Sequence, residues 1–103
     1  MCKKKLMTKL KYFKLGHKRC HYCCVQLNYS SGFKNSATIE HIVPRSKGGG
    51  LAQINSLVVC QKCNKRRADK NFVGFVTSSR FPRKDWLISK YKKAEEYYEQ
   101  RNT

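Results

Sequence analysis

The chain has 103 residues, enough for one domain, and its 23 lysine and arginine residues outnumber six acidic residues to give a formal net charge of +17. No apolar run approaches the roughly 18 residues of a membrane-spanning helix, and lysines at 9, 11 and 14 interrupt the apolar core that an export signal requires. We therefore expect a soluble cytoplasmic protein, or a virus- or phage-encoded one acting in the host cytoplasm, with no membrane partner. Such a charge favours nucleic acid as the partner, because lysine and arginine neutralise phosphates largely independently of base sequence.

The N-terminal segment, residues 3–15, predicts a short basic helix. Leu6, Leu10 and Phe13 recur at helical spacing among lysines. We expect this apolar stripe to pack on the core and the lysine face to stay free for DNA.

Two strands are predicted in the middle of the chain. Residues 28–36 are rich in serine, asparagine and glycine and predict a loop, after which a strand fits residues 37–41. Pro44 and the glycines at 48–50 require a second loop, and a second strand fits residues 56–59.

Helical patterns return toward the C-terminus. Residues 61–70 contain few strand formers and predict the opening of a helix, whereas the apolar residues 72–76 fit either a strand or a buried turn. Residues 85–100 predict an amphipathic helix, and its aromatic stripe is expected to face the core rather than stack on bases. The stripe consists of Trp86, Tyr91, Ala94 and Tyr98.

Two paired-cysteine knuckles stand out, Cys20-x-x-Cys23 and Cys60-x-x-Cys63. Two intervening residues let both sulfurs of a pair face one tetrahedral ion, so two such pairs predict a structural Zn²⁺ site that leaves no ligand position for substrate. Cys24 could replace Cys23 as a ligand, although Cys23 gives both knuckles the same spacing. Cys2 has no sequence partner and is expected to be free.

The stretch between the knuckles carries an acid and an imidazole side by side, Glu40 and His41. Histidine suits the role of a base that deprotonates water, because its pKa of roughly 6.5 leaves it largely neutral. A divalent ion such as Mg²⁺ prefers oxygen ligands, and Glu40 and the amide of Asn64 can supply them. Because neighbours on a strand face opposite sides, we expect Glu40 and His41 where the strand gives way to loop.

This ordered series resembles the HNH endonuclease family, in its zinc-stapled branch, over roughly residues 16–70. The residues that carry the resemblance are Cys20-x-x-Cys23, Glu40-His41-Ile42-Val43-Pro44-Arg45-Ser46-Lys47-Gly48-Gly49, Asn55 and Cys60-x-x-Cys63-Asn64. The resemblance implies a small α+β domain with the ββα-metal (treble-clef-like) fold, a structural four-cysteine zinc site and flanking amphipathic helices. We expect one domain over residues 1–103, with a basic helix at 1–15, the HNH core at 16–75 and a helical extension at 76–103.

The resemblance also implies roles for individual residues. Glu40, where the family usually has Asp, and Asn64 would hold a catalytic Mg²⁺ or Mn²⁺ ion, His41 would be the general base, and Asn55 would orient the histidine loop. Arg67 and Ala68 stand where many members have Lys and Gly, and Ser56 stands where Leu is common.

The expected activity is metal-dependent hydrolysis of phosphodiester bonds in DNA, expected to be double-stranded. Phosphate contacts are expected from Arg45, Lys47, Lys65, Arg66 and Arg67. The alternative is a non-catalytic zinc-stabilised module that binds nucleic acid. This alternative explains the cysteines and the charge but not the occurrence of Glu40, His41 and Asn64 together. A homodimer, an accessory partner, and a role in a mobile element, phage packaging or host defence all stay open.

Overall fold

The computed structural model describes residues 3–50 and 52–101, with side chains for residues 8–50 and 52–100. It is an α+β structure in which helices surround a two-stranded antiparallel sheet. The elements in chain order are α1 (Lys3–Lys14), β1 (Ala37–His41), β2 (Ser56–Cys60), α2 (Gln61–Arg67), α3 (Phe72–Ser78) and α4 (Lys84–Arg101), with short 3₁₀ helices at Arg45–Lys47 and Gln53–Asn55. The expected α+β class, with helices flanking the strands, is confirmed.

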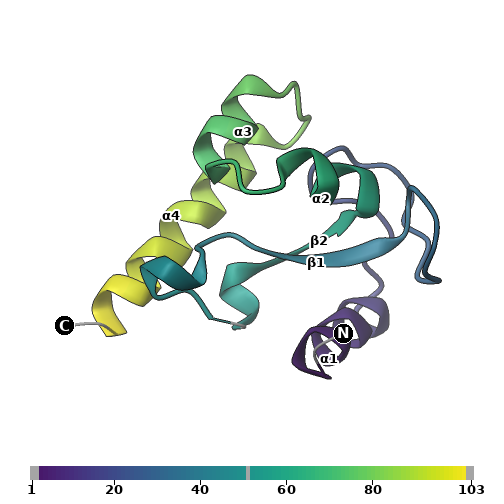
Figure 1. Cartoon of the computed structure of the whole chain (residues 1–103), viewed down its shortest axis with the longest axis horizontal. Coiled ribbons are helices and arrows are strands. Elements are labelled where there is room, and N and C mark those ends of the chain that lie inside the picture. The colour runs from purple at the N-terminus through teal and green to yellow at the C-terminus, as the bar shows by residue number, and fades with distance from the viewer. Residues whose placement is uncertain (1–2, 51, 102–103) are drawn as a thin grey trace.

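The sheet separates two helices. In its register Ala37 pairs with Cys60, Glu40 with Leu57 and His41 with Ser56. Helix α1 lies on one side of the sheet and α2 on the other (Figure 1). Because side chains alternate along a strand, successive residues of β1 face different helices.

The apolar residues 72–76, for which we expected a strand or a buried turn, lie in helix α3. The side chain of Asn71 accepts a hydrogen bond from the Gly74 N–H and caps the helix. Phe72, Phe75 and Val76 are buried at helical spacing. The expectation was wrong because a short apolar run fits strand or helix equally, and the cap at Asn71 decides between them.

Helix α4 carries the C-terminal part of the core, as predicted, but Leu87 and not Trp86 is the first residue of its buried face. Leu87, Ala94 and Tyr98 are buried, and Tyr91 stacks on Phe72 with ring centroids 5.4 Å apart. Trp86, which we expected in this stripe, remains partly exposed. Leu87 starts the i, i+4, i+7, i+11 series that the core requires.

Helix α1 forms as predicted, yet it attaches to the core by a different face. Leu10 and Phe13 are 49% and 58% exposed, whereas Tyr12 is buried and its hydroxyl donates to the Ser56 carbonyl at 3.1 Å. Burial raises the pKa of Tyr12. The side chain of Leu6 lies outside the described ones. Leu10 and Phe13 therefore stay at the surface, and Tyr12 is the residue that is buried among the described side chains of α1.

Within the described residues, every helix is too short or too polar to cross a membrane.

Candidate active site and metal centre

Four cysteines from distant parts of the chain meet at one point. The sulfurs of Cys20, Cys23, Cys60 and Cys63 all lie within 4.8 Å of one another. The Cys23 and Cys60 sulfurs are 3.8 Å apart. A tetrahedral ion with Zn–S bonds of about 2.3 Å requires sulfurs about 3.8 Å apart. The cluster can hold a metal ion, and its dimensions fit zinc.

Backbone N–H groups point at these sulfurs. The N–H groups of Cys60 and Tyr22 donate to Cys20 Sγ at 3.2 and 3.3 Å, and the N–H of Cys63 donates to Cys60 Sγ at 3.4 Å. Hydrogen bonding from the Cys63 thiol and from backbone N–H groups lowers the pKa of Cys20 to about 5. The same hydrogen bond raises the pKa of Cys63. Because one thiolate makes its neighbour harder to ionise, all four sulfurs can act as ligands only when a cation balances their charge.

Cys23, and not Cys24, is the fourth member of the cluster. Cys24 has a positive φ of 66° and turns the chain away, and its carbonyl accepts a hydrogen bond from Arg19 at 3.1 Å. The structure therefore favours the even spacing of the two knuckles. Cys2 lies outside the described residues.

A buried histidine, His21, holds the first knuckle against the sheet. Its backbone N–H donates to the Val58 carbonyl at 3.0 Å, and its imidazole Nδ1 accepts from the Val58 N–H at 3.3 Å. Burial, with the nearby His17, lowers the pKa of His21 to about 3. Such a residue serves structure, and the sequence alone did not separate it from the other histidines.

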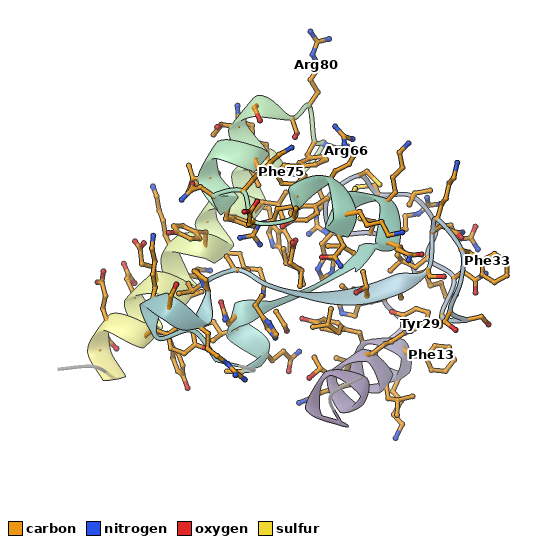
Figure 2. The ribbon with its side chains drawn as sticks, viewed as in Figure 1. Phe13, Tyr29, Phe33, Arg66, Phe75 and Arg80 are labelled. Atoms are coloured by element: carbon orange, nitrogen blue, oxygen red, sulfur yellow. The ribbon has the colours of Figure 1, made fainter. Side chains whose placement is uncertain are left out.

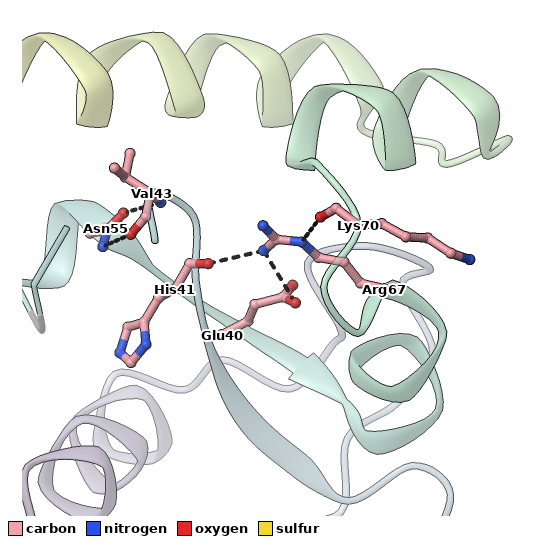
Figure 3. Close-up of polar contacts among 6 residues, drawn as sticks. All are labelled: Glu40, His41, Val43, Asn55, Arg67 and Lys70. Carbon is pink, nitrogen blue, oxygen red and sulfur yellow. Dashed lines mark hydrogen bonds and ion pairs between the residues drawn. The ribbon is translucent and has the colours of Figure 1, made fainter. Parts of the chain in front are cut away.

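Glu40 is buried on β1 and forms an ion pair with Arg67 (Figure 3). The two residues are 6% and 7% exposed, and Arg67 Nη1 lies 3.3 Å from Glu40 Oε1. The other carboxylate oxygen, Oε2, is buried without a hydrogen-bond partner among the described residues. Burial raises the pKa of Glu40, and the positive charge of Arg67 opposes this effect. One carboxylate oxygen is therefore paired with Arg67, and the buried Tyr22 hydroxyl near the carboxylate also opposes the rise of its pKa.

Sequence reasoning missed Arg67 as the partner of Glu40. Its guanidinium also donates from Nη1 to the His41 carbonyl at 2.9 Å and from Nε to the Lys70 carbonyl at 3.2 Å. Arg67 follows the buried Cys63 by four residues on α2, and this spacing, which puts both on one side of the helix, was the available signal. We expected Arg67 to contact phosphate, but the structure buries its side chain against Glu40.

His41 is half-buried at the last position of β1, where the strand gives way to loop. Figure 3 shows its imidazole and the Glu40 carboxylate leaving the strand in different directions, with Arg67 on the side of Glu40. This is the alternation expected of neighbouring strand residues. The structure thus places the two groups on one strand end without turning them toward a single point.

Asn55 is fully buried and fastens the loop that follows His41. Its Oδ1 accepts from the Val43 N–H at 2.6 Å, and its Nδ2 donates to the carbonyls of Val43 and Gly50 at 3.0 and 2.8 Å. Such contacts fix the shape of the loop after the histidine. This geometry is what a loop-orienting residue needs.

Asn64 directly follows Cys63 in α2 and is half-buried. It lines a groove of about 530 Å³ between β1 and α2, together with Thr38, Ile39 and Lys65. Glu40 and His41 do not line this groove. Asn64 and Arg67 are three residues apart, so both lie on the side of α2 that faces β1.

The loop after β1 presents two basic residues. Arg45 and Lys47 are exposed on a 3₁₀ helix, as are Lys65 and Arg66 on α2. Gly49 is required here because a Cβ would lie 1.8 Å from the Val43 carbonyl oxygen. The glycine therefore permits a close approach of the chain to itself.

A family model for HNH endonucleases matches residues 20–72, just over half of the chain. Searches of curated proteins and of solved structures find no match. The matched span contains the four-cysteine cluster and the segment from Glu40 to Arg67. This chain belongs to the HNH endonuclease family.

Proposed function

We propose that this protein is a metal-dependent DNA endonuclease that hydrolyses phosphodiester bonds. Membership of the HNH family supports nuclease chemistry and a nucleic acid substrate. The net charge of +17 supports a polyanionic substrate. DNA, rather than RNA, and a double-stranded substrate are our inference.

The observation that carries the proposal is the joint between β2 and α2. Cys60 ends β2 and caps α2, and Cys63 and Asn64 follow within the first turn. The four-cysteine cluster therefore holds α2, which bears Asn64, against the sheet whose strand β1 bears Glu40 and His41. A structural Zn²⁺ at the four cysteines would fix these three residues relative to one another.

A catalytic divalent ion, Mg²⁺ or Mn²⁺, would be held by Glu40 and Asn64. The chemistry of the donors suits such an ion, because both residues offer oxygen and because, among the described residues, Arg67 pairs with Glu40 Oε1 and no hydrogen bond to Oε2 is formed. When bound, the ion supplies positive charge against the charge that develops on the phosphate and on the leaving 3′ oxygen.

His41 would act as the general base. In the proposed step the imidazole takes a proton from water as the water oxygen bonds to phosphorus. The bond from phosphorus to the 3′ oxygen breaks, its electrons stay on that oxygen, and a proton from solvent converts it to a 3′ hydroxyl, which leaves a 5′ phosphate. Arg67 would hold the backbone of His41 through its carbonyl, and Asn55 would hold the following loop. Both are positioning residues in this scheme.

Four exposed cations would grip the phosphates, namely Arg45, Lys47, Lys65 and Arg66. They come from the loop after β1 and from α2, on either side of the strand end. Arg67 is not among them, because its buried guanidinium is paired with Glu40.

One observation favours a second function, a non-catalytic zinc-stabilised module that binds nucleic acid. The His41 imidazole and the Glu40 carboxylate leave β1 in different directions, and one oxygen of Glu40 is already paired with Arg67. A module that only binds DNA would need neither group.

A plasmid-nicking assay separates the two functions. Zinc-loaded protein should convert supercoiled plasmid to nicked or linear forms when Mg²⁺ or Mn²⁺ is added. His41→Ala and Asn64→Ala should abolish cleavage while zinc content and DNA affinity stay unchanged. No cleavage with either ion, or full activity of His41→Ala, would sink the enzyme proposal.

A further inference from the structure

Large apolar side chains stay exposed in the N-terminal third of the chain. Phe13 is exposed on α1, and Phe33 is 52% exposed in the loop before β1. Phe13 also meets Tyr29 edge to face, with ring centroids 5.1 Å apart. Figure 2 shows all three aromatic residues toward the same end of the molecule, with Phe13 and Tyr29 beside α1 and Phe33 on the loop. Exposed aromatic residues that cluster in this way mark a binding surface more often than scattered ones do.

A groove of about 540 Å³ opens beside the rings of Phe13 and Tyr29. We call it the aromatic groove and define it by the residues used below, which are Phe13, Lys18, Gln26, Asn28, Tyr29 and Asn35. The Tyr29 hydroxyl donates to the His17 carbonyl at 2.6 Å. This bond fixes one aromatic wall in advance, so a ligand would not have to order it.

Amide side chains form the polar part of the aromatic groove. Asn28 uses its Oδ1 to accept from the Ser30 N–H at 2.8 Å, and Asn35 uses its Nδ2 to donate to the Gln26 carbonyl at 3.1 Å. Among the described residues, these bonds leave the Asn28 Nδ2 donor and the Asn35 Oδ1 acceptor uncommitted. A donor and an acceptor beside aromatic faces match the edge and the face of a nucleobase.

The charge around the groove selects its ligand. Residues 1–39 contain nine lysine and arginine residues and no aspartate or glutamate. A second copy would bring two such surfaces together and meet repulsion, whereas a phosphate backbone would neutralise them. A concave, amide-lined groove also fits a base better than it fits the flat surface of a lipid bilayer.

We propose that the aromatic groove binds unpaired bases of single-stranded DNA, such as a flap, a bubble or a displaced strand near the cleavage site. The exposed ring of Phe13 stacks on a base, Tyr29 borders the base at an angle to Phe13, the amides contact the edge of the base and Lys18 contacts the adjoining phosphate. The proposal rests on the proposed function for the identity of the nucleic acid as DNA.

The test compares two ligands with the same phosphates. Zinc-loaded full-length protein, without Mg²⁺ or Mn²⁺, is titrated into a labelled twelve-residue oligothymidylate and into an abasic oligonucleotide of equal length, with fluorescence anisotropy as the readout. Base stacking predicts that the oligothymidylate binds about 5- to 100-fold more tightly than the abasic strand.

Substitutions then locate the effect. Phe13→Ala should remove most of the difference without changing abasic affinity. Phe13→Leu, which keeps an apolar contact with Tyr29, should do the same if the ring face matters. Leu15→Ala is the matched control, because Leu15 is 57% exposed on the same segment but does not line the groove. It should leave both affinities unchanged, and Lys18→Ala should weaken both ligands equally.

Several results would overturn the proposal. They are equal affinity of the wild type for both strands, unchanged oligothymidylate affinity in both Phe13 variants, or stronger Phe13-dependent binding to oligouridylate, to phosphatidylserine vesicles or to a second copy. The assay contains no cleavage step. A protein that cuts no plasmid yet shows the stacking difference would therefore refute only the proposed nuclease function.

Discussion

Arg67 Nη1 lies 3.3 Å from Oε1 of Glu40 and donates a 2.9 Å hydrogen bond to the carbonyl of His41. One buried guanidinium thus holds two consecutive residues of β1. Removing one partner of a buried ion pair leaves an uncompensated charge, which typically costs about 3–5 kcal/mol. We expect Arg67→Met to lower the free energy of unfolding by about that amount, as measured by urea denaturation of the zinc-loaded protein.

Arg66→Met is the control for this substitution, because it removes the same charge from the exposed neighbouring position. It should change stability by less than about 0.5 kcal/mol. Arg67→Lys should fall between the two, since an ammonium group can pair with Glu40 but does not reproduce the planar fork of the guanidinium. Equal stability of the Arg66 and Arg67 variants would show that the ion pair does not hold the strand end.

The four-cysteine cluster predicts a sharp contrast between adjacent residues. Cys23→Ser should lower zinc affinity and unfold the knuckle, because the three remaining sulfurs cannot complete a tetrahedral site. Cys24→Ser should retain one zinc per chain, because Cys24 lies outside the cluster. Metal content by atomic absorption, and the change in circular dichroism on adding a chelator, measure both effects. Zinc loss in Cys24→Ser together with zinc retention in Cys23→Ser would reverse the assignment.

The buried amide of Asn55 should contribute more to the stability of the fold than the exposed amide of Gln53 does. Asn55→Asp replaces the Nδ2 donor, which bonds the carbonyls of Val43 and Gly50, with a second acceptor in a buried position. Each buried group left unsatisfied costs about 1–3 kcal/mol, so we expect a loss of at least about 2 kcal/mol by urea denaturation. Gln53→Glu makes the same chemical change at an exposed position and should be nearly neutral. A similar small effect for both would show that the loop does not depend on Asn55.

The parts of this fold that the sequence predicted are those decided by local spacing. Cys20-x-x-Cys23 and Cys60-x-x-Cys63 place their sulfurs by short-range geometry, and the structure brings all four together. The prediction of which face of α1 packs on the core was wrong, because that face is decided by a contact with a distant part of the chain and not by local spacing. Periodicity selected Leu10 and Phe13, but among the described side chains of α1 the one buried in the core is Tyr12, whose hydroxyl is hydrogen-bonded to Ser56. A buried tyrosine between exposed apolar residues does not produce the apolar periodicity from which a buried helix face is read.

The candidate site divides in the same way. The sequence named Glu40, His41, Asn55 and Asn64, and the structure places them at the end of β1, immediately before β2 and on α2, with Asn64 next to Cys63. It did not pair Glu40 with Arg67, because an arginine in a basic cluster looks like a phosphate contact. Only the packing of α2 on β1 shows that Arg67 turns inward while Arg66 stays exposed.

Burial of Glu40 predicts a specific dependence of stability on pH. Its raised pKa means that the folded protein binds this proton more tightly than the unfolded chain does. The resulting stability is therefore fully present below about pH 4.5, the ordinary carboxyl value, and is lost as the pH rises through the raised pKa. We expect the free energy of unfolding of the wild type, relative to Glu40→Gln, to fall as the pH rises from about 4.5 in zinc-loaded protein without added Mg²⁺ or Mn²⁺.

The control is Asp69→Asn, which removes a carboxylate from an exposed position and should show no such difference. Added Mg²⁺ or Mn²⁺ should flatten the fall, since an ion bound at Glu40 favours the ionised carboxylate. Urea denaturation at a series of pH values measures the two effects. A difference that rises with pH would mean that Arg67 stabilises the carboxylate more than burial penalises it, and a fall that added ions leave unchanged would argue against Glu40 as a ligand of the catalytic ion.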